Sequence, residues 1–160
     1  MEFVIRKIDH EQLKKARKAM IQFIQKYGER RITASGIRWL RQVKETHLSD
    51  DGNLILAALH ERRLVGLVAI ADYGRKESLI VVHPQYRRQN VAIRMVDKAF
   101  KDLGKLYGRV AIDNIPSLSM CFEAGFVAFA LAKGPTGKPT LWIGKGNWRK
   151  DEISRAQSLD

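Results

Sequence analysis

The stretch VVHPQYRRQNVAIRMV, residues 81–96, joins two patterns that decide the architecture around it. Its first residues continue an apolar, β-branched run that is typical of a buried strand, and its last residues carry apolar side chains at helical spacing. A proline, two glutamines, two arginines and an asparagine stand between these patterns. The sequence therefore predicts a buried strand that leads through a short polar loop into an amphipathic helix.

The predicted loop has the features of an anion site. The first N–H groups of a helix have no partner within it, and the helix dipole makes that end positive. Asn90 belongs to the few residue types other than glycine that adopt positive φ readily, and Ala92 is small enough for a ligand to approach the backbone. With Arg87 and Arg88 beside them, these residues suit a pyrophosphate. A charged surface turn is the alternative that the spacing leaves open.

The composition is that of a globular chain with a large basic excess. The 160 residues are 45% hydrophobic, which suits one domain, expected over residues 1–147 with a polar tail at 148–160. Lys and Arg number 29 against 17 Asp and Glu, giving a net charge of +12. This excess favours polyanionic partners such as nucleic acid, phosphorylated cofactors or anionic membrane.

The sequence lacks the patterns typical of membrane-spanning, secreted, disulfide-linked and metal-binding proteins. No apolar run approaches the roughly 20 residues of a membrane span, and the first residues do not resemble a secretory signal, so we expect a cytoplasmic monomer or homodimer without a membrane partner. One cysteine and four separated histidines predict neither a disulfide nor a metal site.

The remaining periodicities predict an α/β chain in the order β, α, α, β, β, β, α, β, α, β, β. A helix at 10–28 is followed by a second helix that Thr33 or Ser35 caps, with an apolar stripe that continues to His47. The third helix is expected to run from Val91 through Leu106, and a short fourth one has Pro116 in its first turn and stops at Gly125. The strands are expected at 2–9, 54–60, 64–73, 79–83, 109–113, 126–132 and 140–144.

Two segments resemble the GNAT superfamily of N-acetyltransferases. The stretch VHPQYRRQNVAIRMV is similar to its acetyl-coenzyme A signature, Arg-x-x-Gly-x-Gly or Ala, with Arg87, Asn90 and Ala92 on the motif positions. The segment NIPSLSMCFEAGF, residues 114–126, resembles the family's later helix, and Gly66 matches a glycine of its preceding hairpin. The resemblance covers roughly residues 53–131. It implies a three-layer α/β (α+β) fold with a central mixed, mostly antiparallel sheet flanked by helices.

The resemblance implies an enzyme that moves an acetyl group from acetyl-CoA to a primary amine of an unidentified small molecule or protein by direct attack. The pantetheine arm would pair with the strand at Val81 and Val82, where it diverges from the strand 109–113. Asn114 would contact the cofactor or a water, although helix capping is the favoured alternative. The other implied cofactor contacts are Arg87, Arg88, Gln89, Asn90, Val91, Ala92, Ile93 and Ser117.

Candidate residues can be named for three catalytic roles: the oxyanion donor, the general base and the acid that protonates the thiolate. The resemblance suggests the amide of Val82 as donor to the developing oxyanion. Glu77 is the best placed general base, although the family's usual glutamate position falls on Lys76 and a turn carboxylate is the alternative. Cys121 stands where many members have a tyrosine that protonates the departing thiolate, with a small core residue as the alternative. Asp72 and Asp113 are further possible carboxylates, and a structural role is expected for His83.

The acceptor is expected in a groove between the two N-terminal helices and the hairpin 134–139. A basic enzyme disfavours polyamines and suits acceptors that carry phosphate or carboxylate, or proteins on ribosomes or nucleic acid. In GKGNWRK, residues 144–150, Trp148 can stack on a base while Arg149 and Lys150 contact phosphate. This segment keeps open a second function, a non-catalytic nucleic-acid- or ribosome-associated binding module with the same fold.

Overall fold

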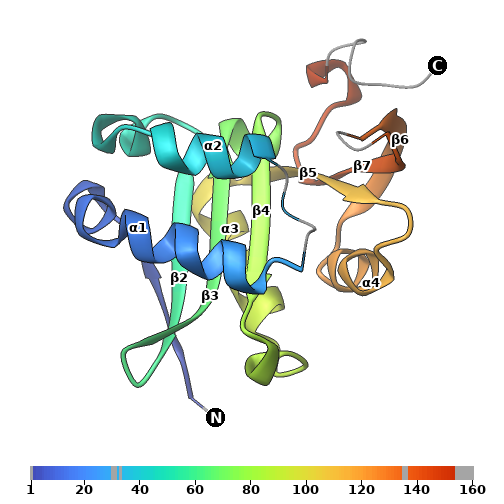
Figure 1. Cartoon of the computed structure of the whole chain (residues 1–160). Coiled ribbons are helices and arrows are strands. Elements are labelled where there is room, and N and C mark those ends of the chain that lie inside the picture. The colour runs from blue at the N-terminus through green and yellow to red at the C-terminus, as the bar shows by residue number, and fades with distance from the viewer. Residues whose placement is uncertain (1, 30–31, 33, 135–136, 154–160) are drawn as a thin grey trace.

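The computed structural model of the chain describes residues 2–29, 32, 34–134 and 137–153, and its elements follow the order that the sequence predicts (Figure 1). The α-helices are α1 (His10–Tyr27), α2 (Ala34–Gln42), α3 (Val91–Leu103) and α4 (Ile115–Glu123). The strands are β1 (Val4–Lys7), β2 (Leu54–His60), β3 (Arg63–Ala71), β4 (Glu77–Val82), β5 (Lys105–Ala111), β6 (Val127–Lys133) and β7 (Pro139–Gly146).

The strands form two antiparallel sheets whose facing edges are β4 and β5. The first sheet has the order β1-β2-β3-β4 and the second the order β5-β7-β6. In Figure 1, α1 and α2 cover one face of the first sheet, α3 lies behind it, and α4 lies beside the second sheet. The predicted α+β class, with largely antiparallel strands between helical layers, is therefore confirmed.

β4 and β5 are close at one end and diverge at the other. The short 3-10 helix Asp72–Gly74 packs directly on β5, because a Cβ on Gly74 would lie 1.8 Å from the carbonyl oxygen of Tyr107. One residue further along β5, a Cβ on Gly108 would lie 3.7 Å from Ser78 Oγ. Beyond this point no ladder joins the two strands within the described residues. A cavity lined by Ser78, Leu79 and Ile80 of β4 and by residues 108–111 of β5 shows that the gap opens toward the end of β4.

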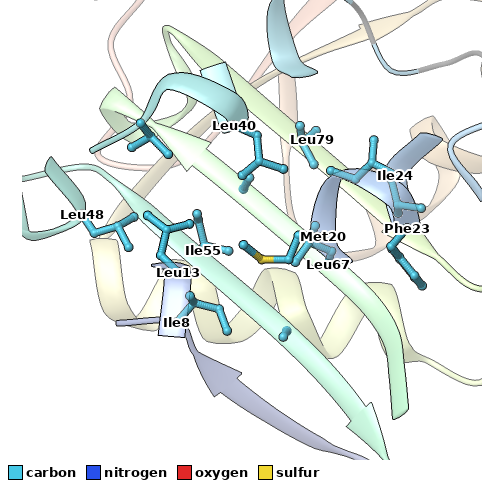
Figure 2. Close-up of a cluster of buried hydrophobic side chains, with 14 residues drawn as sticks. Ile8, Leu13, Met20, Phe23, Ile24, Leu40, Leu48, Ile55, Leu67 and Leu79 are labelled. Carbon is cyan, nitrogen blue, oxygen red and sulfur yellow. The ribbon is translucent and has the colours of Figure 1, made fainter. Parts of the chain in front are cut away.

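Two hydrophobic clusters hold the helices on opposite faces of the first sheet. Leu13, Met20 and Ile24 of α1 are almost fully buried against Leu67 of β3 and Leu79 of β4 (Figure 2). Successive strand residues point to opposite faces, and Ile80 and Val82 of β4 pack in the cluster that contains α3. Burial of each such Leu or Ile side chain contributes about 1.5–3 kcal/mol. Strand β4, whose end leads into the loop before α3, is thus held by hydrophobic packing on both of its faces.

Local signals account for most helix ends. Asp9 and Gln12 form a reciprocal capping box at the start of α1, with Asp9 Oδ1 accepting from the Gln12 N–H at 2.8 Å. Helix α3 ends at Gly104, whose φ of 81° is left-handed. The prediction that Leu106 continues this helix is wrong, because the chain reverses at Gly104 and Leu106 lies in β5.

The second helix is also shorter than predicted. It ends at Gln42, and His47 lies instead in the 3-10 helix Glu45–Ser49. Thr33, one of its predicted caps, lies outside the described residues. In the part of the chain that the structure describes, no helix combines the length and the apolar character needed to cross a bilayer.

The described part of the polar tail, residues 148–153, packs against the second sheet. The Trp148 ring stacks on the Phe129 ring with centroids 4.6 Å apart, and Ile153 is buried. Residues 154–160 of the predicted tail lie outside the described residues. The segment from Trp148 was predicted from its polar composition to fray as a tail, and this is wrong for residues 148–153, which pack on the sheet.

Candidate functional site

The loop between β4 and α3 adopts the backbone conformation expected for an anion site. Asn90 has φ 63° and ψ 18°, so the prediction that it takes a left-handed conformation is confirmed. Arg88 is left-handed as well, with φ 61°. The first backbone bond of the helix runs from the Arg94 N–H to the Asn90 carbonyl at 3.0 Å. The amides of residues 91–93 consequently have no acceptor within the helix and form a positive helix end.

A cavity of about 600 Å³ lies at this helix end. The end of β4, the end of α1 and the first residues of α4 form its other walls. Gln89 is the predicted cofactor residue that does not line it, because its side chain is exposed and Nε2 donates to the Gln85 carbonyl at 3.1 Å. The predicted cofactor residues that do line it are Val81, Val82, Arg87, Arg88, Asn90, Val91, Ala92, Ile93, Asn114 and Ser117.

Gly66 lets α3 approach the sheet beside this cavity. A Cβ at this position would lie 2.8 Å from Met95 Cε and 3.1 Å from Val91 Cγ1. Any larger residue in β3 would have to displace the first turns of α3. The glycine that the resemblance singles out thus positions the helix end that faces the cavity.

The hydrogen-bond register of β4 decides which main-chain groups face the gap toward β5. The His83 N–H donates to the Val65 carbonyl of β3 at 2.8 Å. Because antiparallel ladders alternate, the amides of Ser78, Ile80 and Val82 point away from β3. None of these three amides donates to a backbone carbonyl of the described residues. The edge of β4 that faces the gap is therefore an unpaired strand edge.

The same register separates the two valines that the sequence predicts as pairing partners. Val82 presents its amide to the gap, whereas Val81 is paired with Leu67 of β3. Val81 therefore lines the cavity without a main-chain group to offer there. The two valines differ because neighbouring amides of a strand point in opposite directions. The sequence alone does not show which of the two amides pairs with β3.

The two arginines of the loop have different roles. Arg87 forms an ion pair with Glu29, and its Nε and Nη2 donate to the carbonyls of Val82 at 3.3 Å and Tyr27 at 3.4 Å. These contacts tie the end of α1 to the loop. Arg88 lines the cavity and makes no ion pair within the described residues. Arg88 is consequently the arginine that is free to meet a bound anion.

A second cavity of about 200 Å³ continues along the gap between β4 and β5. It shares Ile80, Asn114 and Ser117 with the first cavity. The described residues of its lining are apolar or neutral apart from Arg109 of β5. The two cavities together form an elongated cleft from the amino end of α3 to the level of Ser78 and Gly108.

Cys121 is placed in this second cavity but is poorly suited to act as an acid. It is buried in α4, and burial raises the pKa of its thiol to about 11. An ordinary thiol has a pKa of about 8.5, so proton transfer from Cys121 to a departing thiolate is uphill. The small core residue, which was the alternative interpretation, describes it better.

The predicted carboxylates are not gathered in the cleft. Glu77 is buried on the face of β4 that packs against α1 and α2, and it lines neither cavity. Asp72 pairs with Arg75 at 2.7 Å, and Asp113 pairs with Lys138 at 2.9 Å. Of the candidate bases, Glu77 alone is free of an ion pair within the described residues.

Two polar residues near the cleft resolve open alternatives. Asn114 occupies the N-cap position of α4, yet its side chain makes no capping hydrogen bond and faces both cavities. The favoured capping role is therefore wrong. His83 is buried beside the Tyr27 ring, its Nδ1 accepts from the Gln85 N–H, and burial lowers its pKa. A structural role suits this arrangement.

Arg109 and the end of α1 are the site features that the sequence analysis missed. Tyr27, Gly28 and Glu29 line the larger cavity, because Arg87 draws the end of α1 toward the loop. Arg109 opens the predicted strand 109–113, which the resemblance places beside the pantetheine arm. The start of this strand was therefore the feature of the sequence that could have pointed to Arg109. No local sequence pattern indicates that the end of α1 lies at the cavity.

The chain combines an α+β fold with an elongated cleft between two diverging strands. A family model described as an acetyltransferase (GNAT) domain matches residues 23–129, which is 107 of the 160 residues. The chain belongs to the GNAT acetyltransferase family. No curated protein matches the sequence significantly.

Solved structures agree with this assignment at the level of the fold. A GNAT acetyltransferase from Streptococcus pneumoniae superposes with a TM-score of 0.69 at 16% identity, over 91% of this chain and 99% of that chain. A dodecameric spermidine N-acetyltransferase from Vibrio cholerae gives 0.65 at 15% identity, over 97% and 98%. An IAA acetyltransferase from Bacillus cereus gives 0.64 at 11% identity, over 91% and 99%.

Proposed function

We propose that this chain transfers an acetyl group from acetyl-CoA to a primary amine by direct attack. The observation that carries the proposal is the continuity of the cleft. The left-handed turn at Asn90 and the free amides of α3 meet the unpaired edge of β4 at Val82. An anion at the helix end and an extended chain along the strand edge are what these two features recognise. Acetyl-CoA combines a diphosphate with an extended amide-containing arm.

The residues of the cleft support binding of the donor in one orientation. Arg88 and the amides of residues 91–93 would hold the diphosphate, and the amides of Val82 and Ile80 would bond the pantetheine arm. Acetyl-CoA supplies the activated thioester. An amide of β4 that faces the cleft would donate to the developing oxyanion, the role predicted for Val82.

The chemistry needs few side chains. As the new C–N bond forms and the C–S bond breaks, the amine must lose a proton, and Glu77 is the carboxylate of β4 that we propose to receive it through water. The thiolate would take its proton from solvent. A covalent acyl-cysteine route is disfavoured, because Cys121, with a pKa of about 11, stays protonated at neutral pH.

Binding of acetyl-CoA is the first test. At about a hundred times its dissociation constant, a ligand that binds only the folded state adds roughly 2.7 kcal/mol. For a chain of this size, the melting temperature should rise by roughly 5–10 °C. Release of free thiol in the presence of amines then measures transfer. An unchanged melting temperature at saturating acetyl-CoA would reject the proposal.

Ala92→Glu tests the position of the donor. The substitution places bulk and negative charge in the first turn of α3, where the diphosphate is expected, so the thermal shift should disappear while the fold is kept. Ala19→Glu, at an exposed position of α1, makes the same change away from the cleft and should leave the shift intact. A full shift in Ala92→Glu would place the donor elsewhere.

The alternative binding module receives less support from the C-terminal segment. One face of the Trp148 ring is covered by Phe129, and Arg149 pairs with Asp151 at 2.8 Å. Both side chains already have partners within the fold. One face of the Trp148 ring is therefore closed to a base, and Arg149 is already paired with a carboxylate. Tight RNA binding without an acetyl-CoA shift would nevertheless favour the module.

A further inference from the structure

Arg109 is unusual among the residues that line the cleft. It is half-buried and carries the only charge among the described residues that line the smaller cavity, which are otherwise apolar or neutral. A guanidinium stays charged at any physiological pH. A charge beside an apolar wall is unfavourable unless it is paired. The structure therefore places at one end of the cleft a positive charge that has no acidic partner among the described residues.

Neighbouring cations are neutralised within the fold. Arg75 pairs with Asp72 and also with Glu152, and Lys138 pairs with Asp113. Arg109 has no ion pair in the described part of the chain; its guanidinium lies over the Trp142 ring, 5.3 Å from the centroid. Arg109, like Arg88 in the larger cavity, thus faces the cleft without an acidic partner among the described residues.

Trp142 fixes the position of the Arg109 side chain. It is the ladder partner of Arg109 on β7, its side chain is fully buried, and its indole N–H has no acceptor among the described residues. A buried donor without an acceptor is rare and costs free energy. Trp142 lines neither cavity, so its buried ring forms a rigid support that holds the Arg109 guanidinium in place.

The position of Arg109 separates this anion from the diphosphate of the donor. Gly108 lies beside Ser78, four residues before Val82, so about 13 Å of strand separates Arg109 from the α3 end at about 3.3 Å per residue. The Arg109 side chain also points to the face away from α3, because Leu106 packs on the α3 side and strand residues alternate. Glu77 of β4 lies on that same face.

We infer that Arg109 binds an anionic group, a carboxylate or a phosphate, on the acceptor amine. Its guanidinium is suited to a carboxylate or phosphate because it presents paired N–H donors. Held there, the acceptor would present its amine to the acyl end of the cleft, on the side of Glu77. This inference rests on the function proposed above and names the acceptor class, amines that carry a negative charge in preference to neutral amines and polyamines.

The test compares amines that differ by one anionic group. The probes are phenylalanine with phenethylamine, and phosphoethanolamine with ethanolamine, with thiol release as the readout of kcat/KM. In each pair the anionic member should be acetylated at least tenfold more efficiently. In Arg109→Gln this preference should fall at least tenfold, and in Arg109→Lys it should be intermediate. Arg149→Gln, an exposed arginine away from the cleft, should keep the full preference.

The outcomes distinguish the inference from the function on which it rests. Equal rates within the pairs, a preference for the neutral members, or an undiminished preference in Arg109→Gln would overturn it. Failure to acetylate any anionic probe while acetyl-CoA still raises the melting temperature would overturn it as well. An absent acetyl-CoA shift would instead reject the transferase function itself. If Arg109 only covers Trp142, its substitution would lower stability without changing the preference between paired amines.

Discussion

At the scale of single residues, Asn90 carries the conformation on which the donor site depends. Its φ of 63° is accessible to asparagine and glycine at little cost, whereas a β-branched side chain there costs about 1–2 kcal/mol. We expect Asn90→Gly to fold and to bind acetyl-CoA. We expect Asn90→Val to lower the free energy of unfolding by about 1–2 kcal/mol and to reduce the acetyl-CoA thermal shift. Urea unfolding and thermal melts measure the two effects.

Gln89→Val is the matched control for this prediction. Gln89 precedes Asn90 in the same exposed loop and does not have a positive φ. Valine should therefore be tolerated there with little change in either measurement. Similar losses in both variants would show that the loop responds to β-branched side chains in general, and that the left-handed turn has no special role.

Residue types alone predicted some site features and missed others for physical reasons. The positive φ of Asn90 could be predicted from its residue type, because few other side chains tolerate that conformation. The role of Asn114 was misjudged, because a cap position does not say where the side chain turns. The elevated pKa of Cys121 depends on packing from several elements, so no local pattern could show it.

At the scale of elements, Glu152 fastens the C-terminal segment to the sheets. Its carboxylate accepts from Tyr107 Oη at 2.7 Å, Lys105 Nζ at 2.8 Å and Arg75 Nη1 at 3.1 Å. The hydrogen bonds from Lys105 and Tyr107 lower the pKa of Glu152 below its usual value of 4.5. One side chain thus connects the segment after β7 with β5 and with the turn before β4, where the two sheets are closest.

Glu152→Gln should lower the free energy of unfolding at pH 7 by about 1–2 kcal/mol, because charge-assisted hydrogen bonds are lost at a partly exposed site. The folded pKa is lowered, so this contribution of the carboxylate is complete above about pH 4.5 and is lost as the pH falls through the folded pKa. The difference between wild type and variant should therefore shrink in acid. Urea unfolding at neutral and acidic pH measures it.

Asp151→Asn serves as the control for Glu152. Asp151 pairs with Arg149 on the surface, where both side chains are about two thirds exposed (66% and 71%). Its loss should leave stability nearly unchanged at both pH values. An equal effect of the two substitutions would mean that general charge balance, and not the buried hydrogen bonds of Glu152, stabilises the segment.

The order of the elements was predictable from periodicity, but their contacts were not. Apolar spacing located each helix and strand to within a few residues, and the error at Leu106 arose because its apolar side chain fits both the helix and the following strand. Glu152 bonds residues 47 and 77 positions away, and such pairings leave no local trace. The gap between β4 and β5 was expected only through the family resemblance.

At the scale of the whole molecule, the net charge of +12 raises the question of whether the chain binds polyanions through a built site or through its surface alone. The exposed side of α1 carries Lys14, Lys15 and Lys18. Surface charge of this kind attracts nucleic acid without selecting a sequence, and the affinity falls steeply with salt. The cleft, by contrast, owes its shape to buried strands and helices that these lysines do not touch.

Replacing Lys14, Lys15 and Lys18 by Glu separates the two properties. Each substitution replaces a positive charge by a negative one and lowers the net charge by two, so the triple variant carries +6 where the wild type carries +12. We expect wild-type binding to single-stranded RNA to be weak and lost at high salt, and the variant to bind less at every salt concentration. The acetyl-CoA thermal shift should be the same in both, because residues 91–93 and β4 are unchanged. RNA binding that resists both high salt and the triple substitution would contradict this expectation and indicate a dedicated nucleic-acid site on this fold.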